Sequence, residues 1–206
     1  MDEISYIKQR GIGLSGGAAT GKSTISKIIR EQGFRVFDAD VLARQAVAPG
    51  SDTLSALVAK CGDSILSADG SLARKKLGAM IFADARLRKD VETLIHARIW
   101  QLLGEEVRDY HAEAGDQAYW FFDAALLFET GNYQRFAQIW LTTCPESVQR
   151  QRLIARDHLS PAYADQVLAS QFPLEHKKHL AQVIIDTAQP IALGKKLVLA
   201  HLKTLR

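Results

Sequence analysis

A glycine-rich octapeptide near the N-terminus constrains this chain more than any other feature. Residues 16–23 read GGAATGKS, which is a complete G-x-x-x-x-G-K-[ST] motif. The motif follows the apolar run Ile12–Ser15 and opens a stretch expected to be helical, Ser23–Glu31. Glycines let a backbone wrap closely around phosphate oxygens, and a helix N-terminus adds partial positive charge there. The motif therefore predicts a strand, a phosphate-binding loop and a helix. A glycine-rich turn without a ligand is the alternative, and this context disfavours it.

Two side chains of the motif have expected roles of their own. Lys22 would reach the β- and γ-phosphates of a nucleotide, and the Ser23 hydroxyl would coordinate Mg²⁺. The full set of residues expected to contact the nucleotide in this loop is Gly17, Ala18, Ala19, Thr20, Gly21, Lys22, Ser23 and Thr24.

Short apolar runs alternate with longer amphipathic stretches along the 206 residues, of which 47% are hydrophobic. The runs are apolar at consecutive positions, which is typical of strands covered on both faces. Helical stretches between them indicate parallel βαβ units and an α/β fold. Pro161 after Ser160 predicts a helix start, as does Pro190. The expected strands are Ile12–Ser15, Arg35–Ala39, Tyr119–Ala124, Ile139–Thr143 and Gln182–Asp186.

Composition excludes several classes of protein. No apolar stretch approaches the roughly 18 residues that a membrane helix needs, and the first ten residues show no signal peptide. Cys61 and Cys144 lack metal spacing, which favours a reducing compartment, so we expect a cytoplasmic protein. The formal net charge of +3 suits a small polyanion as well as a nucleic acid and decides nothing.

The stretch Ser51–Glu113 is too long for a single crossover between strands, and we expect a helical insertion that holds a second substrate. Its register shows in Val91, Leu94, Ile95, Arg98, Ile99 and Leu102, most of which should share one helix face. Arg74–Arg108 has a basic excess, for which a solvated helix face is the simpler interpretation. A shorter helical excursion is expected over Pro145–His179.

Three carboxylates stand at the expected ends of strands. The helix after Lys22 and the strand before Asp40 have similar lengths, so Asp40 should return to the level of the phosphate loop and activate a hydroxyl. A helix N-cap is the alternative for Asp40, and Asp38 is expected to be structural. Asp123 ends the apolar run Tyr119–Phe122, a pattern typical of a carboxylate that supports Mg²⁺.

Arginines cluster in the second helical excursion. Arg152 and Arg156 are four residues apart and should share a helix face, whereas Arg150 points elsewhere. They could clamp phosphate charge, or pair with Glu146 and Asp157 on a solvated face. The six histidines form no metal set. His96 could be a buried, hydrogen-bonded residue or a phosphate contact, and we expect the buried role.

Five segments in order resemble the motifs of the dephospho-CoA kinase family over nearly the whole chain. They are GLSGGAATGKST, DADVLAR, GSLARKKLGAMIF with LIHARI, FFDAALLFETG, and RLIARDHLSPAYADQVLASQFPLEHKK. The resemblance implies ATP and Mg²⁺, and phosphorylation of the ribose 3′-hydroxyl of dephospho-CoA to give coenzyme A. It also implies a P-loop core with a parallel five-stranded sheet, made of residues 1–48, 114–144 and 182–206. Residues 49–113 would bind the CoA moiety, and 145–181 would form a lid.

Site residues follow from the resemblance position by position. Asp40, Lys22 and Arg152 would be catalytic, and Arg152 and Arg156 would be nucleotide-binding lid arginines. Ser23 and Asp123 would serve the metal. The acceptor would be contacted by Asp40, Arg44, His96, Asp123 and Leu126. The partners would be ATP and dephospho-CoA, with no nucleic acid or membrane, and the chain would be a monomer or a weak homo-oligomer.

Some positions depart from the family pattern. Ala19 replaces a usual Gly, which we expect to be tolerated only at negative φ. Ala97 and Ala125 replace prolines, while Gln166, Gln182 and Thr187 replace Arg, Asp and Asn. Gln166 lacks the positive charge of the arginine that is usual at this position, which affects the expected affinity for ATP more than the reaction type.

Two other functions remain as alternatives. One is a kinase of the same fold acting on a nucleoside or shikimate, against which the long insertion argues. The other is a regulatory P-loop protein that binds nucleotide without transfer, against which Lys22, Ser23, Asp40 and Asp123 argue.

Overall fold

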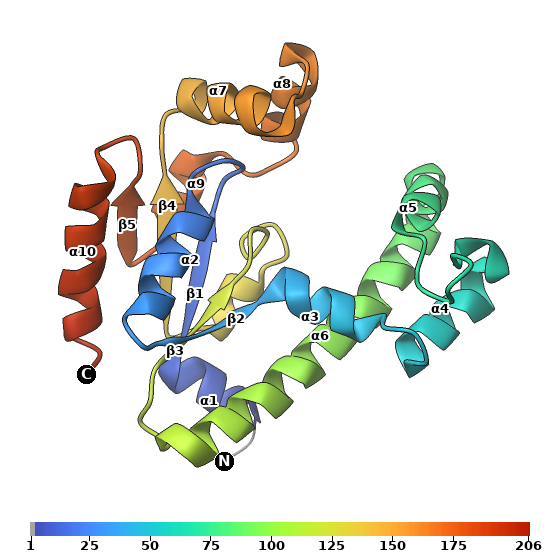
Figure 1. Ribbon diagram of the computed structural model, residues 1–206, viewed down its shortest axis with the longest axis horizontal. Helices are drawn as coiled ribbons and strands as arrows, with labels where there is room; N and C mark the ends of the chain where they lie inside the picture. The colour runs from blue at the N-terminus through green and yellow to red at the C-terminus, as the bar shows by residue number, and fades with distance from the viewer. Residues whose placement is uncertain (1–2) are drawn as a thin grey trace. The chain divides into compact units, whose positions relative to one another are not determined.

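The computed structural model describes residues 3–206, with side chains from Ile7 onward. The chain forms two compact units, one made of residues up to Phe37 together with Ala114–Arg206, and the other of Asp38–Glu113 (Figure 1). Among residues 3–206, no helix is long and apolar enough to span a membrane.

A five-stranded parallel sheet forms the centre of the first unit, in the order β2-β3-β1-β4-β5. Its strands confirm the five expected from the apolar runs, with ends shifted by at most one residue. Ala39, for instance, begins a helix rather than ending a strand. The strands are β1 (Gly11–Gly16), β2 (Arg35–Asp38), β3 (Trp120–Asp123), β4 (Gln138–Thr143) and β5 (Val183–Asp186).

Helices α2 (Lys22–Glu31) and α10 (Ile191–Lys203) contact each other and cover one face of the sheet. The core there contains Ile12 and Leu14 of β1 with Ile29 of α2. On the other face, a Cβ on Gly13 of β1 would lie 3.3 Å from the Phe136 ring, on which Phe122 of β3 stacks with ring centroids 5.6 Å apart. Alternate residues of β1 therefore meet different layers, and the sheet is covered on both faces as the apolar runs predict.

The N-terminal segment forms a helix, α1 (Glu3–Arg10), which runs directly into β1. The sequence patterns did not indicate this helix. Gly11 at the junction is crowded, because a Cβ there would lie 2.8 Å from the Ile7 carbonyl oxygen and from the Trp120 ring. Glycine is thus required by close packing at this position.

The Asp38–Glu113 unit is helical and has its own core. It contains α3 (Ala39–Ala46), α4 (Asp52–Cys61), the short 3₁₀ helix η1 (Asp63–Ile65), α5 (Arg74–Ala83) and most of α6 (Ala85–Ala114). On α6, Val91 and Ile99 are buried as expected, but Leu103 is buried where Leu102 was expected. The buried positions continue in steps of four residues from Ile99, which places 103 on the stripe and 102 beside it.

The second helical excursion consists of α7 (Glu146–Asp157), α8 (Pro161–Ala169) and α9 (Leu174–Lys178). The Ser160 hydroxyl accepts a hydrogen bond from the Tyr163 N–H at 3.3 Å, and Pro161 is the first residue of α8, which confirms the predicted helix start. Pro190 immediately precedes α10. Another 3₁₀ helix, η2 (Asn132–Arg135), leads into β4.

Candidate active site

A cavity of about 750 Å³ lies over the phosphate loop. Its lining comes from four parts of the first unit: the loop and the start of α2, helix α7, the end of β5 with the segment after it, and helix α10. From the loop and α2 come Gly17 and 19–25, and α7 contributes Arg152, Ala155 and Arg156. The end of β5 and the segment after it contribute Asp186, Thr187 and Gln189, and α10 contributes Ile191 and Gly194. The volume is in the range of small-ligand sites.

The loop joins β1 to α2 as the motif predicts. Gly21 at the helix start has φ +81°, a conformation that favours glycine. The Thr20 hydroxyl is hydrogen-bonded to the Gly17 carbonyl oxygen and to the Thr142 hydroxyl, both at 2.8 Å. A Cβ on Gly16 would collide with both threonine hydroxyls. The first N–H groups of α2 have no partner four residues earlier within the helix, which suits them to phosphate oxygens.

Ala19 lies in the left-handed region with φ +55°, so the expectation of a negative φ was wrong. The turn of the loop sets the backbone there, and the methyl group is carried in a conformation that costs an L-residue about 1–2 kcal/mol. The loop therefore stores strain at this position.

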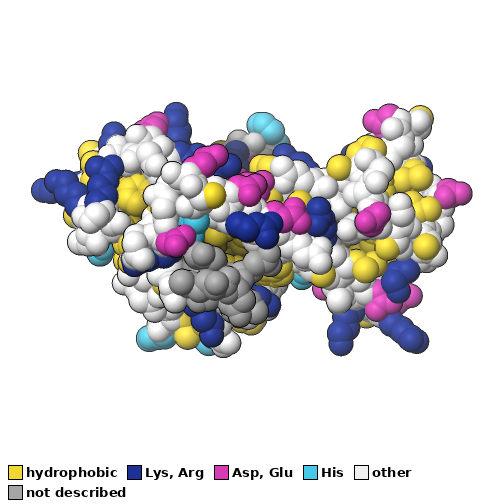
Figure 2. Space-filling model, turned by 90° about the horizontal axis from the view of Figure 1, so that it is seen from below, with side chains coloured by type: hydrophobic (Ala, Val, Ile, Leu, Met, Phe, Trp, Pro, Cys, Tyr) yellow, Lys and Arg dark blue, Asp and Glu magenta, His cyan; other side chains and the backbone are white. Residues whose placement is uncertain are grey.

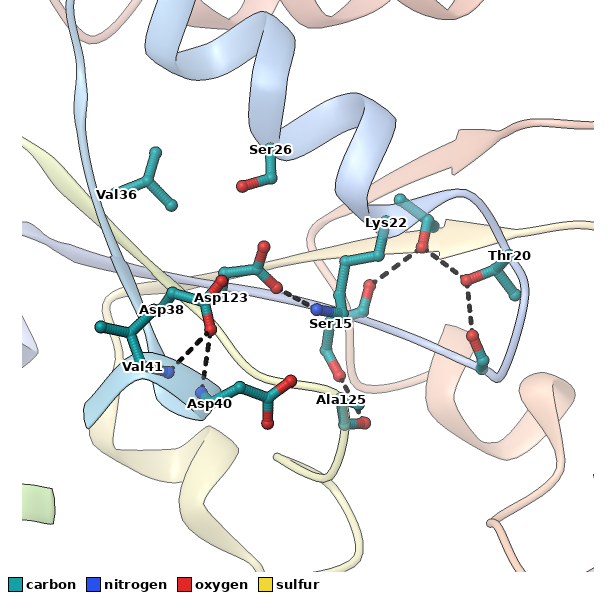
Figure 3. Close-up of polar contacts among 12 residues, drawn as sticks. Ser15, Thr20, Lys22, Ser26, Val36, Asp38, Asp40, Val41, Asp123 and Ala125 are labelled. Atoms are coloured by element: carbon teal, nitrogen blue, oxygen red, sulfur yellow. Dashed lines mark hydrogen bonds and ion pairs between the residues drawn. The ribbon is translucent and has the colours of Figure 1, made fainter. Parts of the chain in front are cut away.

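Lys22 and Asp123 form an ion pair at the end of β3 (Figure 3). The Lys22 Nζ contacts Asp123 Oδ1, and the Asp123 side chain is only 4% exposed. Nearby, the Ser15 hydroxyl donates to the Ala125 carbonyl oxygen at 3.2 Å. The motif lysine is thus held at the cavity by a carboxylate from the neighbouring strand, 101 residues away along the chain.

Arg152 is fixed against the phosphate loop. Its guanidinium donates to the Ala19 carbonyl oxygen at 3.3 Å, and to the Thr187 hydroxyl and carbonyl oxygens at 3.3 and 2.8 Å. Thr187 in turn donates to the Thr20 carbonyl oxygen at 2.6 Å. Sequence patterns marked Thr187 only as a departure from the family. Its place directly after β5 was the signal that it lies beside the loop.

The neighbouring Cys144 lies 3.8 Å from the Arg152 guanidinium. Burial raises the pKa of its thiol. Cys144 therefore packs as a neutral side chain.

The other two arginines of α7 are bound to carboxylates. Arg150 makes a two-point contact with Asp165 of α8, at 2.6 and 3.2 Å, which raises the pKa of Arg150 and lowers that of Asp165. Arg156 contacts Asp157 with two bonds of 2.7 Å. Arg156 nonetheless lines the cavity beside Arg152, whereas Arg150 does not belong to the lining.

Asp38 caps helix α3 in the second unit. Its Oδ1 accepts from the Asp40 N–H at 2.8 Å and the Val41 N–H at 3.4 Å (Figure 3). The N-cap alternative for Asp40 is therefore wrong, because the cap lies two residues earlier. Asp40 stands in the first turn with an exposed side chain, and Arg44 is exposed in the last turn.

His96 is exposed, so the expectation of a buried histidine was wrong. It follows the half-buried Ile95 by one residue, which turns it about 100° away from the buried stripe of α6. On the face of the molecule seen in Figure 2, basic and acidic side chains are interspersed over this unit. The basic residues Arg74, Lys75, Lys76, Arg86, Arg88 and Lys89 are all exposed.

The donor set suits Mg²⁺ that arrives with a nucleotide. No group of three or more His, Cys, Asp or Glu residues that could hold a metal is found in the described part of the chain. The exposed Ser23 hydroxyl and the Asp123 carboxylate supply hard oxygen donors. Mg²⁺ often takes one or two protein ligands and completes its shell with phosphates and water.

Leu126 lies after β3 with 49% of its surface exposed. In the same segment, the Glu129 carboxylate holds the fully buried Lys177. Nothing in the sequence pattern indicated this pair, since its members are on segments that only the packing of α9 brings together.

A family model and curated relatives point to one family, and solved structures share the fold. A family model described as dephospho-CoA kinase matches residues 10–192. A dephospho-CoA kinase from Geobacter sulfurreducens is 42% identical over 175 residues, which is 85% of this chain and 88% of the relative. The crystal structure of TT1252 from Thermus thermophilus has a TM-score of 0.80 and 27% identity, covering 95% of this chain and 96% of that one. Dephospho-CoA kinase from Campylobacter jejuni shares the fold, with a TM-score of 0.70 and 24% identity, covering 94% and 95%.

Proposed function

The chain belongs to the dephospho-CoA kinase family, and from this premise we propose which of its residues carry the γ-phosphoryl group of ATP to the ribose 3′-hydroxyl of dephospho-CoA. It is an ATP-dependent kinase of coenzyme A biosynthesis with a P-loop nucleotide site. The observation that supports the assignment most is the Lys22–Asp123 pair beside the phosphate-loop cavity. The pair supports the proposal, because a bound triphosphate and its metal need a cation and a carboxylate beside them.

The nucleotide is proposed to lie in the cavity with its phosphates on residues 17–24. Lys22 exchanges its contact with Asp123 for the β- and γ-phosphates, and Arg152 and Arg156 neutralise charge from the lid, residues 145–181. Ser23 and Asp123 would hold Mg²⁺, which on binding screens the charge of the phosphates. Arg152 already donates a hydrogen bond to the loop at the Ala19 carbonyl oxygen. When ATP binds, its guanidinium would therefore have to exchange only the group that it contacts.

Asp40 is proposed as the base. It accepts the proton of the 3′-hydroxyl while the 3′-oxygen forms a bond to the γ-phosphorus and the bond from that phosphorus to the bridging oxygen of ADP breaks. The capping of α3 by Asp38 supports this role, because the cap leaves the Asp40 carboxylate exposed on a fixed first turn. A positioned base contributes about 10²–10⁴-fold.

The acceptor is proposed to be held by Arg44, His96, Asp123 and Leu126 together with the insertion, residues 49–113. Exposure of Arg44 and His96 and the half-exposed Leu126 support contact with a ligand. The exposed lysines and arginines of α5 and α6 offer charge-assisted contacts to a pyrophosphate. A cytoplasmic location and a monomer or weak homo-oligomer remain predictions.

A phosphotransfer assay with Mg·ATP tests the acceptor. Dephospho-CoA, AMP, adenosine and shikimate are offered side by side, and kcat/KM is measured for each. We expect dephospho-CoA to exceed AMP by at least about two orders of magnitude, because its remote contacts orient the hydroxyl. Equal use of AMP, adenosine or shikimate would contradict the acceptor assignment, and nucleotide binding without any transfer would favour a regulatory protein.

A further inference from the structure

One contact to the phosphate loop comes from outside the motif and from outside the cavity lining. The Gln171 side-chain oxygen Oε1 accepts a hydrogen bond from the Ala18 N–H at 2.8 Å. Gln171 lies in the turn between α8 and α9 and is half-buried. Ala18 directly precedes Ala19, whose backbone is strained at a positive φ, so the contact acts next to the strained position of the loop.

The backbone that carries Gln171 is itself held in place. The N–H of the next residue, Phe172, donates to Glu129 Oε1 at 3.0 Å. The same Glu129 oxygen contacts the Lys177 ammonium of α9 at 2.6 Å. The backbone next to Gln171 is therefore held by Glu129 of the segment after β3, and Glu129 is in turn paired with Lys177 of α9.

The ion pair that holds this turn is buried. Lys177 has no exposed surface, and the Glu129 side chain is 14% exposed. The Lys177 ammonium also lies 5.9 Å from the centre of the Phe128 ring. Charges so buried are costly to desolvate, and replacement of such a pair by apolar residues is often neutral for stability. We therefore expect the Glu129–Lys177 pair to matter through the position that it gives to the turn, rather than through the stability that it adds.

We propose that Gln171 is a positioning residue for the phosphate loop, and that the buried Glu129–Lys177 pair keeps it in position. The proposal goes beyond the site residues assigned above, since none of these three residues is among them. A loop that is fixed before ATP arrives loses less conformational freedom on binding. The Gln171–Ala18 bond should therefore act on ATP affinity and leave the transfer step alone.

The first test replaces Gln171 by methionine, which keeps the length of the side chain and removes the acceptor. A neutral hydrogen bond is worth enough to change an equilibrium by roughly three- to tenfold. We expect the Kd and KM for ATP to rise by that factor, with kcat and the KM for dephospho-CoA within about twofold of the wild type. Gln134→Met, at an exposed glutamine of η2, is the matched control and should change none of them.

Two outcomes of this test overturn the proposal. One is an unchanged Kd for ATP in Gln171→Met. The other is a parallel change of kcat, both KM values and the melting temperature, which would show a general structural role. Hydrogen exchange at the Ala18 amide gives an independent measurement, and it should accelerate in Gln171→Met and not in Gln134→Met.

The second test concerns the buried pair. The double variant Glu129→Gln with Lys177→Met removes both charges and leaves no unpaired ion. It should raise the Kd for ATP by a factor similar to that of Gln171→Met, and adding Gln171→Met to it should produce no further rise. Multiplication of the two effects would show that the pair does not act through Gln171, and would overturn that part of the proposal.

Discussion

The two compact units hold their charged side chains in different ways. In the first unit, Asp123 is 4% exposed and paired with Lys22, and Lys177 is fully buried against Glu129. In the Asp38–Glu113 unit, the members of the Lys60–Asp90 pair are 43% and 46% exposed. The first unit thus contains buried ion pairs as well as exposed ones, whereas the Lys60–Asp90 and Arg98–Glu105 pairs of the Asp38–Glu113 unit are both solvated. Removal of one partner from the buried Lys22–Asp123 pair should disturb folding and activity together, whereas substitution of an exposed side chain such as Asp40 should change activity alone.

The largest effect is expected for Lys22→Met. Loss of the charge on the phosphates should lower kcat/KM by at least about 10³-fold. The melting temperature should also fall, because Asp123 is left buried without its partner. The double variant Lys22→Met with Asp123→Asn should regain the melting temperature and stay inactive. If Lys22→Met keeps the turnover and the melting temperature of the wild type, the Lys22–Asp123 pair supports neither activity nor stability.

Asp40→Asn tests the second unit. We expect kcat to fall by about 10²–10⁴-fold, because Asn cannot accept the proton. The melting temperature and the Kd for ATP should be unchanged, since the side chain is exposed. Asp38→Ala is the control, and loss of its cap should cost about 1 kcal/mol of stability. If Asp40→Asn loses ATP binding in a calorimetric titration, Asp40 serves the nucleotide instead.

Ala19→Gly should stabilise the protein. Glycine relieves the positive φ, while its freer unfolded chain offsets part of the gain, so the expected net increase in the free energy of unfolding is about 0.5–1 kcal/mol. Urea denaturation measures it. Ala18→Gly, at a residue outside the positive-φ set, should do the opposite and destabilise. A loss of stability in Ala19→Gly would mean that the loop is not strained there.

The smallest effect is expected for Asp165→Asn, which breaks an exposed pair within the first unit. Arg150 lowers the pKa of Asp165 in the folded state through the hydrogen bond between them. The pair therefore contributes stability above the unfolded pKa of an aspartate, near 4, and loses it as the pH falls through the lowered folded pKa. Thermal melts should show a small deficit for the variant at pH 7 that vanishes in acid. A deficit as large as that of Lys22→Met would remove the distinction between buried and exposed pairs.

Local patterns predicted the sheet and the phosphate loop, because both depend on residues that are neighbours in the sequence. The glycines and Lys22 fix the loop, and consecutive apolar residues fix each strand. Residue-level details were missed where the exact backbone geometry decides: the positive φ that the loop turn imposes on Ala19, the turn of His96 away from the buried stripe of α6, and the position of the helix cap two residues before Asp40. The contact between Glu129 and Lys177 depends on how α9 packs, and no spacing in the sequence encodes it.

The strand order β2-β3-β1 has a consequence for biosynthesis. A ribosome releases β1 and β2 early, yet these strands do not neighbour each other, since β3 lies between them and follows the whole of Asp38–Glu113. Until Trp120–Asp123 emerges, the strand edges that will receive it have no native partner, and such edges invite aggregation. Contacts within Asp38–Glu113 are independent of the later chain and would shorten the loop that β3 must close. The emergence of β3 is therefore the step at which the nascent sheet can first be completed on that side.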